Sequence, residues 1–392
     1  MKTKRIILAV LTSGGYGREV VEGIQDYAHS HAPHWEFYFE GACNHPSVQT
    51  YLRLAVTDWH AHGIIGQLMH GNLPTLVHKH RLPAVNVSSS IPTTIPSVVP
   101  HAGMIGTLAA RYFLDRGLRN LAFIGRNACM YATQQQATFQ AAGTAAGVSC
   151  HLMPEYSRQQ TWVEEFKRIV TWLRKLPRPL GVFACDDRRG RDVLQACHTL
   201  GVRVPDDIAV LGSDNDETSC LLSAPPLSSV ILQGRNIGFQ AAELLDHLMR
   251  GEARPKRPIL VAPSGIVTRR STDIVASDDP NTTAALRFIH DQAHRPITVH
   301  DVLAAAPQSR RAMERRFRLS LGRTPKEEIR RVHLERAKFL LSQTDHKIQN
   351  LAAEAGYSRY SLFVKEFHAH TGMTPSAFRA QLRTASRLIV KG

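Results

Sequence analysis

Residues 297–325 read ITVHDVLAAAPQSRRAMERRFRLSLGRTP, and residues 347–375 read KIQNLAAEAGYSRYSLFVKEFHAHTGMTP. Each stretch combines a short apolar helix, a tight turn, a serine that can cap the next helix, and a basic helix followed by glycine and Thr-Pro. This pattern predicts two helix-turn-helix units, at about 297–322 and 347–372. Since one unit reads one major groove, two units in tandem predict contact with two grooves of double-stranded DNA.

The uneven charge of the chain favours the same partner. The 392 residues carry a formal net charge of +15, and from residue 281 to the end there are 20 Lys/Arg against 9 Asp/Glu. Most of the basic excess therefore belongs to the C-terminal segment. This predicts a polyanionic partner and a steep salt dependence of binding.

A long helix is expected between the two units, because residues 326–343 carry apolar side chains at positions 329, 332, 334, 337, 340 and 341. One rigid helix would hold the two recognition helices about one DNA turn (~34 Å) apart. A monomer would then cover a non-palindromic DNA element, and a dimer would cover two such elements.

Short apolar runs alternate with helical stretches through the first 270 residues. Strands are expected at 6–11, 35–40, 63–68, 83–87, 121–125, 180–184, 208–212 and 259–262. Helices are expected at 18–29, 48–62, 103–116, 162–176, 188–200 and 237–250. This alternation predicts parallel sheets covered on both faces, with ligands bound beyond the carboxyl ends of the strands.

Cysteine usage and hydropathy point to a cytoplasmic protein. The six cysteines form no CxxC pair, which favours reduced thiols. The apolar run near the N-terminus has only six residues and no cleavage site follows it, so a first strand explains it better than a signal peptide. No apolar stretch approaches 18 residues, so no membrane span is expected. The histidines lack metal-site spacing, and neither a metal nor a cofactor is expected.

Two stretches of the first part resemble a known sensor domain. Residues 181–216 (GVFACDDRRGRDVLQACHTLGVRVPDDIAVLGSDND) and 225–251 (PPLSSVILQGRNIGFQAAELLDHLMRG) resemble the second half of the sensor of the lac repressor/GalR family. The resemblance covers about residues 5–272. It implies a periplasmic-binding-protein-like fold in which two α/β lobes hold a small ligand between them. Because the first strand is expected to begin at residue 6, we expect no counterpart of that family's N-terminal DNA-binding unit before it.

The C-terminal segment resembles the AraC/XylS family along residues 284–382. The matching residues include Ser309, Arg316, Phe317, Gly322, Thr324, Pro325, Gly356, Tyr357, Phe363, Phe367, Gly372, Thr374 and Pro375. We therefore expect a two-lobed sensor at 1–272, a linker at 273–283 and an all-α tandem helix-turn-helix domain at 284–392. One departure is Pro307, where the family usually has glycine; proline cannot adopt φ > 0, so the first turn is expected to be reshaped.

The outer faces of the two second helices are the predicted DNA-reading surfaces. On the first, Met313, Phe317 and Leu321 recur at four-residue spacing and are expected in the core. The predicted DNA contacts there are Ser309, Arg310, Arg311, Glu314 and Arg315. Arginine can bind guanine through two hydrogen bonds, and glutamate can accept from cytosine.

On the second recognition helix, Leu362, Phe363 and Phe367 are expected to face inward. The predicted DNA contacts there are Arg359, Tyr360, Ser361 and Lys365. Because many protein–DNA contacts go to the backbone, Ser309, Arg316, Lys326 and Arg330 are candidates for phosphate binding. The alternative is a merely solvated, charged helix face.

The sensor resemblance places an effector site in loops that follow strands. Sugar recognition needs carboxylates, arginines and an aromatic side chain facing several hydroxyl groups. The predicted effector contacts are Tyr16, Arg18, Arg126, Asp186, Asp187 and Asp214. For Asp187, capping of the following helix is the competing explanation.

A nucleotide site is a competing hypothesis for the first loop. Residues 13–18 (SGGYGR) follow a strand and open a helix, and Glu40 ends the next strand, as in a dinucleotide fingerprint. Val20 occupies the position of the third glycine, however, so the pattern is incomplete. The glycines fit a tight turn or the close approach of a small ligand better.

Together the two resemblances predict a DNA-binding transcription regulator controlled by a small sugar. They imply a homodimer that activates transcription with RNA polymerase, and they favour xylose, with another pentose or a hexose as alternatives. No catalytic Ser/His/Asp set or phosphate loop is visible, so an enzyme is not expected. The second hypothesis is a sugar-binding or carbohydrate-processing protein that acquired a DNA-binding tail.

Overall fold

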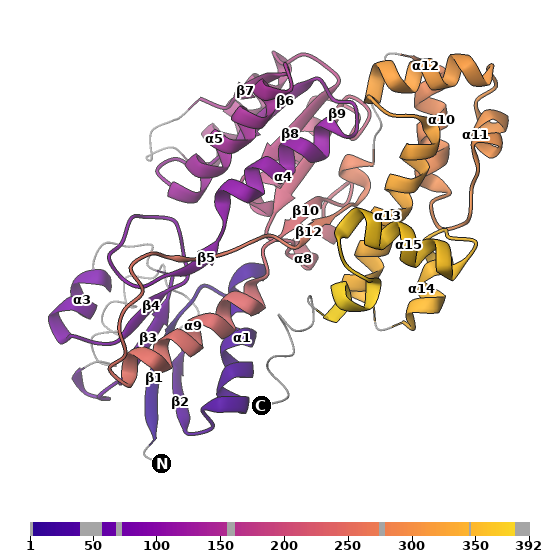
Figure 1. Cartoon of the computed structure of the whole chain (residues 1–392). Helices are drawn as coiled ribbons and strands as arrows, with labels where there is room; N and C mark the ends of the chain where they lie inside the picture. The colour runs from indigo at the N-terminus through magenta and orange to yellow at the C-terminus, as the bar shows by residue number, and fades with distance from the viewer. Residues whose placement is uncertain are drawn as a thin grey trace.

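The computed structural model describes residues 3–39, 57–67, 73–154, 161–273, 279–344 and 346–380. These residues form two α/β lobes and a helical domain that lies beside the second lobe (Figure 1). The fold class predicted from the sequence is therefore confirmed. Glu40 and most of the helix predicted at 48–62 lie outside the described residues.

The first lobe consists of β1 (Lys4–Ala9), α1 (Gly15–His31), β2 (Trp35–Phe39), β3 (Gly63–Gly66), α3 (Leu73–His80), β4 (Ala84–Asn86) and α9 (Gly234–Met249). Its parallel sheet has the order β2-β1-β3-β4. Ile6 and Leu8 pack with α1 and α9, whereas Ile7 and Ile64 pack with Val77 of α3. Burial on both faces explains the almost continuous apolar runs of these strands.

The second lobe consists of α4 (Ala102–Leu114), β6 (Asn120–Ile124), α5 (Met130–Ala145), β7 (Ser149–Leu152), α6 (Trp162–Arg174), β8 (Leu180–Ala184), α7 (Asp187–Thr199), β9 (Ile208–Ser213), α8 (Glu217–Leu221), β10 (Ser228–Ile231) and β12 (Gly265–Val267). Its sheet has the order β12-β10-β9-β8-β6-β7, and β12 is antiparallel to β10. Phe139 and Phe183 lie in one core, and Val182 and Leu194 lie in another.

The chain passes between the two lobes at three places in the described residues. It leaves the first lobe after β5 (Val98–Pro100), returns between β10 and α9, and leaves again between β11 (Ile259–Val261) and β12. Strands β5 and β11 pair in parallel and lie where the lobes meet (Figure 1). A short 3-10 helix, η1 (Arg270–Thr272), then ends the sensor. Paired crossing segments of this kind are suited to act as a hinge.

The helical domain consists of α10 (Pro280–Asp291), α11 (Val299–Ala305), α12 (Arg310–Leu321), α13 (Pro325–Gln343), α14 (Ile348–Glu354) and α15 (Tyr360–Thr371). It has two cores, one around Met313 and Phe317 and one around Phe363 and Phe367. Helix α10 begins within the stretch that the sequence analysis assigned to a linker, because Asp279 caps it through the N–H of Thr282.

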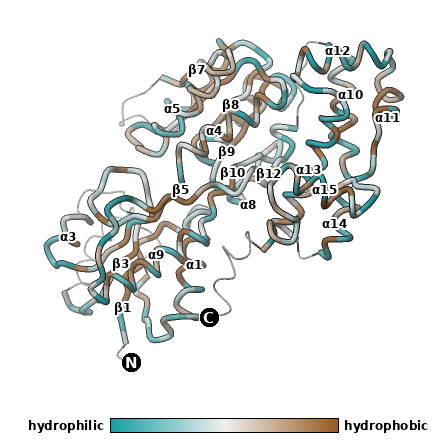
Figure 2. The backbone as a smooth tube through the Cα atoms, viewed as in Figure 1, coloured by the Kyte–Doolittle hydropathy of each residue, from teal (hydrophilic) through white to brown (hydrophobic). Residues whose placement is uncertain are grey.

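Several elements of the second lobe escaped the sequence analysis. The sequence of α5, MYATQQQATFQAAGTA, contains no clear apolar stripe, and β7, β10 and β12 have only three or four residues each. Strands that are buried at every residue, such as β8 and β9, have continuous apolar runs and were easier to predict. Figure 2 shows the contrast between the hydrophobic strand β5 and the largely hydrophilic helix α12.

Candidate DNA-binding surface and effector site

Helix α12 presents a basic outer face. The Ser309 hydroxyl caps the helix by accepting a hydrogen bond from the backbone N–H of Ala312 at 3.2 Å. Met313 and Phe317 are fully buried, so the helix rotation is fixed by the core. Arg311 and Arg315 are consequently exposed, as the helical spacing predicted.

Two other charged residues of α12 already have partners within the domain. The Arg310 guanidinium lies 3.0 Å from the Glu314 carboxylate, and both residues were predicted DNA contacts. Arg316 donates to the Gln308 side-chain oxygen at 2.7 Å and lies 3.4 Å from Asp279. Arg316 would have to leave these partners to reach a DNA phosphate, whereas Arg311 and Arg315 would not.

Helix α15 carries the second predicted recognition surface. Arg359, Tyr360, Ser361 and Lys365 are all exposed. Leu362 was expected in the core, but 42% of its surface is exposed, so that prediction was wrong. Phe363 and Phe367 lie four positions apart and define the buried face, and Leu362 lies about 100° around the helix from Phe363.

The two helix-turn-helix turns differ as Pro307 predicted. In the second unit, Gly356 has φ = +85°, and an added Cβ there would lie 2.5 Å from a ring nitrogen of His333. In the first unit, Ala306 has φ = −133° and the turn contains no left-handed residue. The first turn is thus built from conformations that proline and alanine can adopt.

Helix α13 joins the two units and contributes to both cores. Ile329 and Val332 pack in the first core, and Leu334 and Leu341 pack in the second. The helix starts with a capping box in which the Thr324 side chain and Glu327 satisfy each other's backbone N–H groups. The predicted connecting helix is therefore present as one continuous element.

Asp214 differs from the other predicted effector contacts in its backbone conformation and in its lack of a polar side-chain partner within the described ranges. It follows β9, is partly buried and has φ = 119°, a region that non-glycine residues rarely adopt. Among the described residues, its carboxylate has no hydrogen-bond or ion-pair partner. Burial raises the pKa of Asp214 well above its ordinary value, and the carboxylates of Asp187 and Asp186 raise it further.

Asp186 and Asp187 have distinct structural roles. Asp186 caps α7 by accepting from the backbone N–H of Arg189, so the competing explanation for Asp187, that it caps this helix, was wrong. Asp186 also pairs with Arg126. Burial opposes ionisation of Asp186, but the Arg126 guanidinium holds the pKa of this carboxyl below its ordinary value. This pair links the loop after β6 to the start of α7.

Asp187 holds neighbouring loops together. Its carboxylate accepts hydrogen bonds from the Ser229 hydroxyl at 2.5 Å and from the backbone N–H of Asp216 at 2.8 Å. Burial raises the pKa of Asp187 to about 7, although these two hydrogen bonds favour its charged form. With both oxygens engaged, Asp187 supports the loop that carries Asp214.

Tyr16 and Arg18 approach the site from the first lobe. The Tyr16 hydroxyl donates to the backbone oxygen of Val87 at 2.7 Å, and burial followed by the Asp214 carboxylate raises the pKa of Tyr16. Arg18 instead lies 2.6 Å from Asp216. It lines a cavity of about 730 Å³ that the other five predicted contacts do not line. The structure thus groups Tyr16 with the aspartates and places Arg18 beside them.

Three residues that complete this arrangement were not predicted from the sequence. Asp216 and Ser229 position Asp187, and the Tyr131 hydroxyl lies 3.4 Å from Asp186. Backbone N–H groups of Met130 and Tyr131 donate to the carbonyl oxygens of Ser90 and Ser89 across the lobes. Among these residues, only Asp216 could have been found from the sequence, because it lies in the motif SDND (residues 213–216) directly after a predicted strand.

Comparisons with known proteins agree with both halves of the chain. Residues 110–272 match the periplasmic binding protein-like domain, and residues 303–381 match the helix-turn-helix domain. The xylose operon regulatory protein of Haemophilus influenzae is 31% identical over 379 residues, which cover 93% of this chain and 95% of the relative. The chain belongs to the xylose operon regulatory protein family. The Escherichia coli K12 family member is 30% identical over 390 residues, covering 96% of this chain and 97% of the relative.

A solved structure agrees with this assignment. The xylose-binding transcription activator xylR superposes with a TM-score of 0.62 at 27% identity, covering 97% of this chain and 99% of that chain. Like its family relatives, this chain is therefore a transcription regulator with a helix-turn-helix DNA-binding domain. None of the helices within the described ranges is long and apolar enough to span a membrane.

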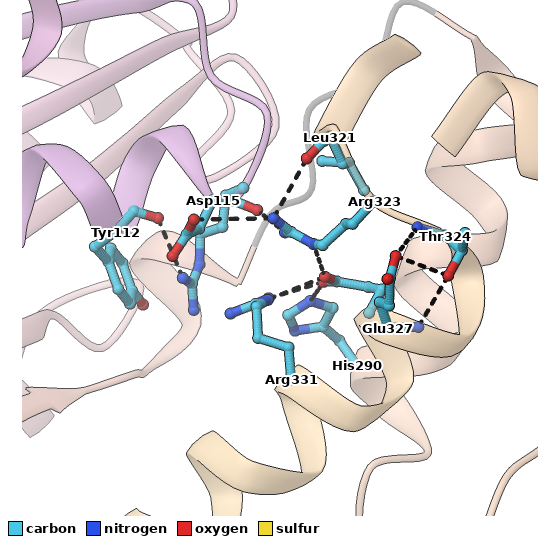
Figure 3. Close-up of polar contacts among 10 residues, drawn as sticks. Tyr112, Asp115, His290, Leu321, Arg323, Thr324, Glu327 and Arg331 are labelled. Atoms are coloured by element: carbon cyan, nitrogen blue, oxygen red, sulfur yellow. Dashed lines mark hydrogen bonds and ion pairs between the residues drawn. The ribbon is translucent and has the colours of Figure 1, made fainter. Parts of the chain in front are cut away.

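In this member of the xylose operon regulatory protein family, ion pairs connect the sensor to the DNA-binding domain. Arg323, just after α12, donates to the backbone oxygen of Asp115 at the end of α4 and pairs with the buried Glu328 of α13 (Figure 3). Arg331 lies 2.8 Å from the Glu328 carboxylate. Burial opposes ionisation, but the hydrogen bond from Arg331 and further interactions lower the pKa of Glu328. The first helix-turn-helix unit is thereby tied to the second lobe.

Proposed function

We propose that this regulator binds D-xylose between the lobes of its sensor and, in response, changes its binding to promoter DNA. The observation that carries the proposal is Asp214, a carboxylate in a strained backbone conformation that has no hydrogen-bond or ion-pair partner in the part of the chain that the structure describes. Strained, polar and unpaired groups are typical of ligand sites. The relatives named above regulate xylose operons, which favours xylose over other pentoses and hexoses.

The effector contacts in this proposal divide into two groups. Tyr16, Arg126 and Asp214 contact the sugar, and the raised pKa of Asp214 lets its carboxyl donate as well as accept a hydrogen bond. Asp186 and Asp187 hold these groups in place through Arg126 and Ser229. Arg18 closes the lobes through Asp216.

The DNA contacts in this proposal lie at the starts of α12 and α15. Arg311, Arg315, Arg359 and Lys365 are exposed cationic side chains, and Tyr360 and Ser361 lie beside them. Ser309, Arg310 and Glu314 remain proposed contacts at the edge of the first surface. Two recognition helices fixed by α13 fit two major grooves on one side of the duplex.

Coupling between the two functions is proposed to run through the second lobe. Closure of the lobes moves α4, and the contact between Asp115 and Arg323 transmits this movement to the first helix-turn-helix unit. Such coupling requires xylose to bind the two arrangements with different affinities. We further propose that the regulator acts in the cytoplasm as a homodimer and activates transcription through RNA polymerase.

The proposal is tested by footprinting the promoter region of the xylose genes with and without a panel of sugars. A footprint that appears or shifts with D-xylose, at lower concentration than with other pentoses and hexoses, is the expected result. A footprint that ignores every sugar, combined with consumption of one of them, would instead favour a carbohydrate-processing protein with a DNA-binding tail.

A further inference from the structure

A second cavity lies between the sensor and the DNA-binding domain. It has a volume of about 860 Å³ and is lined on the sensor side by Arg111, Arg116 and Arg270. On the other side, Arg331 and Arg336 of α13 and the C-terminal end of α15 line it. The cavity is adjacent to the ion pairs of Figure 3 and is separate from the effector residues.

The lining of this cavity is strongly cationic. Seven Arg or Lys side chains line it, against three Asp or Glu side chains. Two of the three acids already have partners, because Asp115 lies near Arg323 and Glu335 lies 2.9 Å from Lys338. Glu328, outside the lining, pairs with Arg331, but Arg111, Arg116 and Arg270 have no ion-pair partner among the described residues. The excess positive charge is therefore only partly neutralised.

Arg116 gives independent evidence that an anion belongs here. Only 5% of its surface is exposed, and its guanidinium stacks 3.5 Å from the centre of the Tyr112 ring. Its nitrogen atoms donate to the Thr272 carbonyl at 3.3 Å and the Thr268 hydroxyl at 3.4 Å. No carboxylate among the described residues lies within 4 Å of them. The carboxylates of Glu328 and Glu335 act on Arg116 only from a longer distance. A buried cation without a direct ion pair is costly, so a bound anion would stabilise it further.

We propose that this cavity binds a small molecule that carries phosphate groups. Arginine guanidinium groups bind phosphate through paired hydrogen bonds, and the cavity offers several from two domains. Because the ligand contacts both domains, it holds the DNA-binding domain against the second lobe. The regulator thereby gains an input distinct from the sugar, through which a phosphorylated metabolite adjusts the DNA response.

The phosphates of DNA are the other source of the same chemistry. The cavity is lined by α13 and by His370 and Thr371 at the C-terminal end of α15. The exposed DNA-reading side chains lie instead at the N-terminal parts of α12 and α15. The position of the cavity therefore favours a small ligand.

The test uses the full-length protein and inorganic pyrophosphate as the probe, with titration calorimetry at constant ionic strength. The test variant is R111Q/R270Q, because both side chains are exposed and neither has an ion-pair partner in the described ranges. The charge-matched control is R174Q/R254Q, which changes exposed sensor residues outside the cavity. We expect saturable binding that weakens at least tenfold in R111Q/R270Q and is unchanged in the control.

The result that overturns the proposal is an absence of saturable binding, or equal weakening in both double variants. A second arm measures DNA affinity without pyrophosphate as a function of salt. If R111Q/R270Q lowers the slope of log affinity against log salt by about two, the cavity cations bind DNA phosphates and the proposal is wrong. An unchanged slope, together with the calorimetric result, supports the small-molecule site.

Discussion

The guanidinium of Arg18 lies 2.6 Å from the carboxylate of Asp216, and the two residues belong to different lobes of the sensor. Arg18 lies near the start of α1, whereas Asp216 follows β9 and donates its backbone N–H to Asp187. The pair thus connects the first lobe to the loop that carries Asp214. Because 44% of the Arg18 side chain is exposed, the ion pair contributes little to the free energy of unfolding. Its main effect is to position the two lobes relative to each other.

Arg18→Ala is expected to weaken xylose binding about tenfold, which corresponds to ~1.4 kcal/mol, because the closed arrangement of the lobes loses a contact. Unfolding stability should change by less than ~1 kcal/mol, as for other exposed pairs. Titration calorimetry of Arg18→Ala, Asp216→Asn and the double variant gives the coupling energy between the two positions. Unchanged xylose affinity in all three variants would refute the proposed closing role.

The pKa of Asp187 predicts a pH dependence of sensor stability. The folded pKa of about 7 lies above the ordinary value of 3.8, so the folded protein binds more protons than the unfolded chain between these values. Stability is therefore lost as the pH rises from about 4 to about 7. The free energy of unfolding, measured with urea, should differ less between pH 5 and pH 7 for Asp187→Asn than for the natural protein. Equal differences in the two proteins would show that Asp187 does not cause the pH dependence.

The two turns should respond differently to substitution. Gly356→Ala places a Cβ in a left-handed conformation and close to His333, so a loss of at least ~1–2 kcal/mol is expected. Pro307→Gly should change stability by less than ~1 kcal/mol, mainly through the entropy of the unfolded chain. Chemical denaturation of the two variants compares the turns directly. Equal losses of stability in the two variants would contradict the predicted difference between the two turns.

Arg311→Ala is expected to weaken specific DNA binding by about 1–3 kcal/mol, because Arg311 is exposed and is a proposed base contact. Arg287→Ala serves as the control, since this arginine of α10 faces Asp206 of the sensor at 3.6 Å. Binding of both variants to specific and unrelated DNA is measured at one salt concentration. Equal weakening on both DNAs would assign Arg311 to phosphate contact instead of base recognition.

Helical spacing predicted much of the DNA-binding domain because its cores are local. Met313 and Phe317 repeat every four residues, and the connecting helix has its apolar positions in one chain segment. Leu362 was misassigned because an apolar residue beside Phe363 satisfies the same pattern without facing the core. The difference between the two turns was also predictable from the sequence, since Pro307 excludes the left-handed conformation that Gly356 adopts.

The candidate effector site was predictable only in part, because the residues that contact one another there are distant in sequence. Loops after strands pointed to Asp186, Asp187 and Asp214, but no local pattern distinguishes a ligand contact from a supporting residue. The pairing of Arg18 with Asp216 joins residues 198 positions apart. The interdomain contact of Arg323 with Asp115 spans 208 positions and had no sequence signal.

The most direct test of the account is the affinity of the full-length protein for promoter DNA, measured with and without D-xylose for the natural chain and Asp214→Ala. Glu243→Gln is the control, because Glu243 is an exposed carboxylate of α9. We predict that xylose changes the DNA affinity of the natural chain and the control. Asp214→Ala should keep the DNA affinity measured without sugar and lose the response. A response that survives in Asp214→Ala, or a loss of sugar-free DNA binding in that variant, would contradict the account.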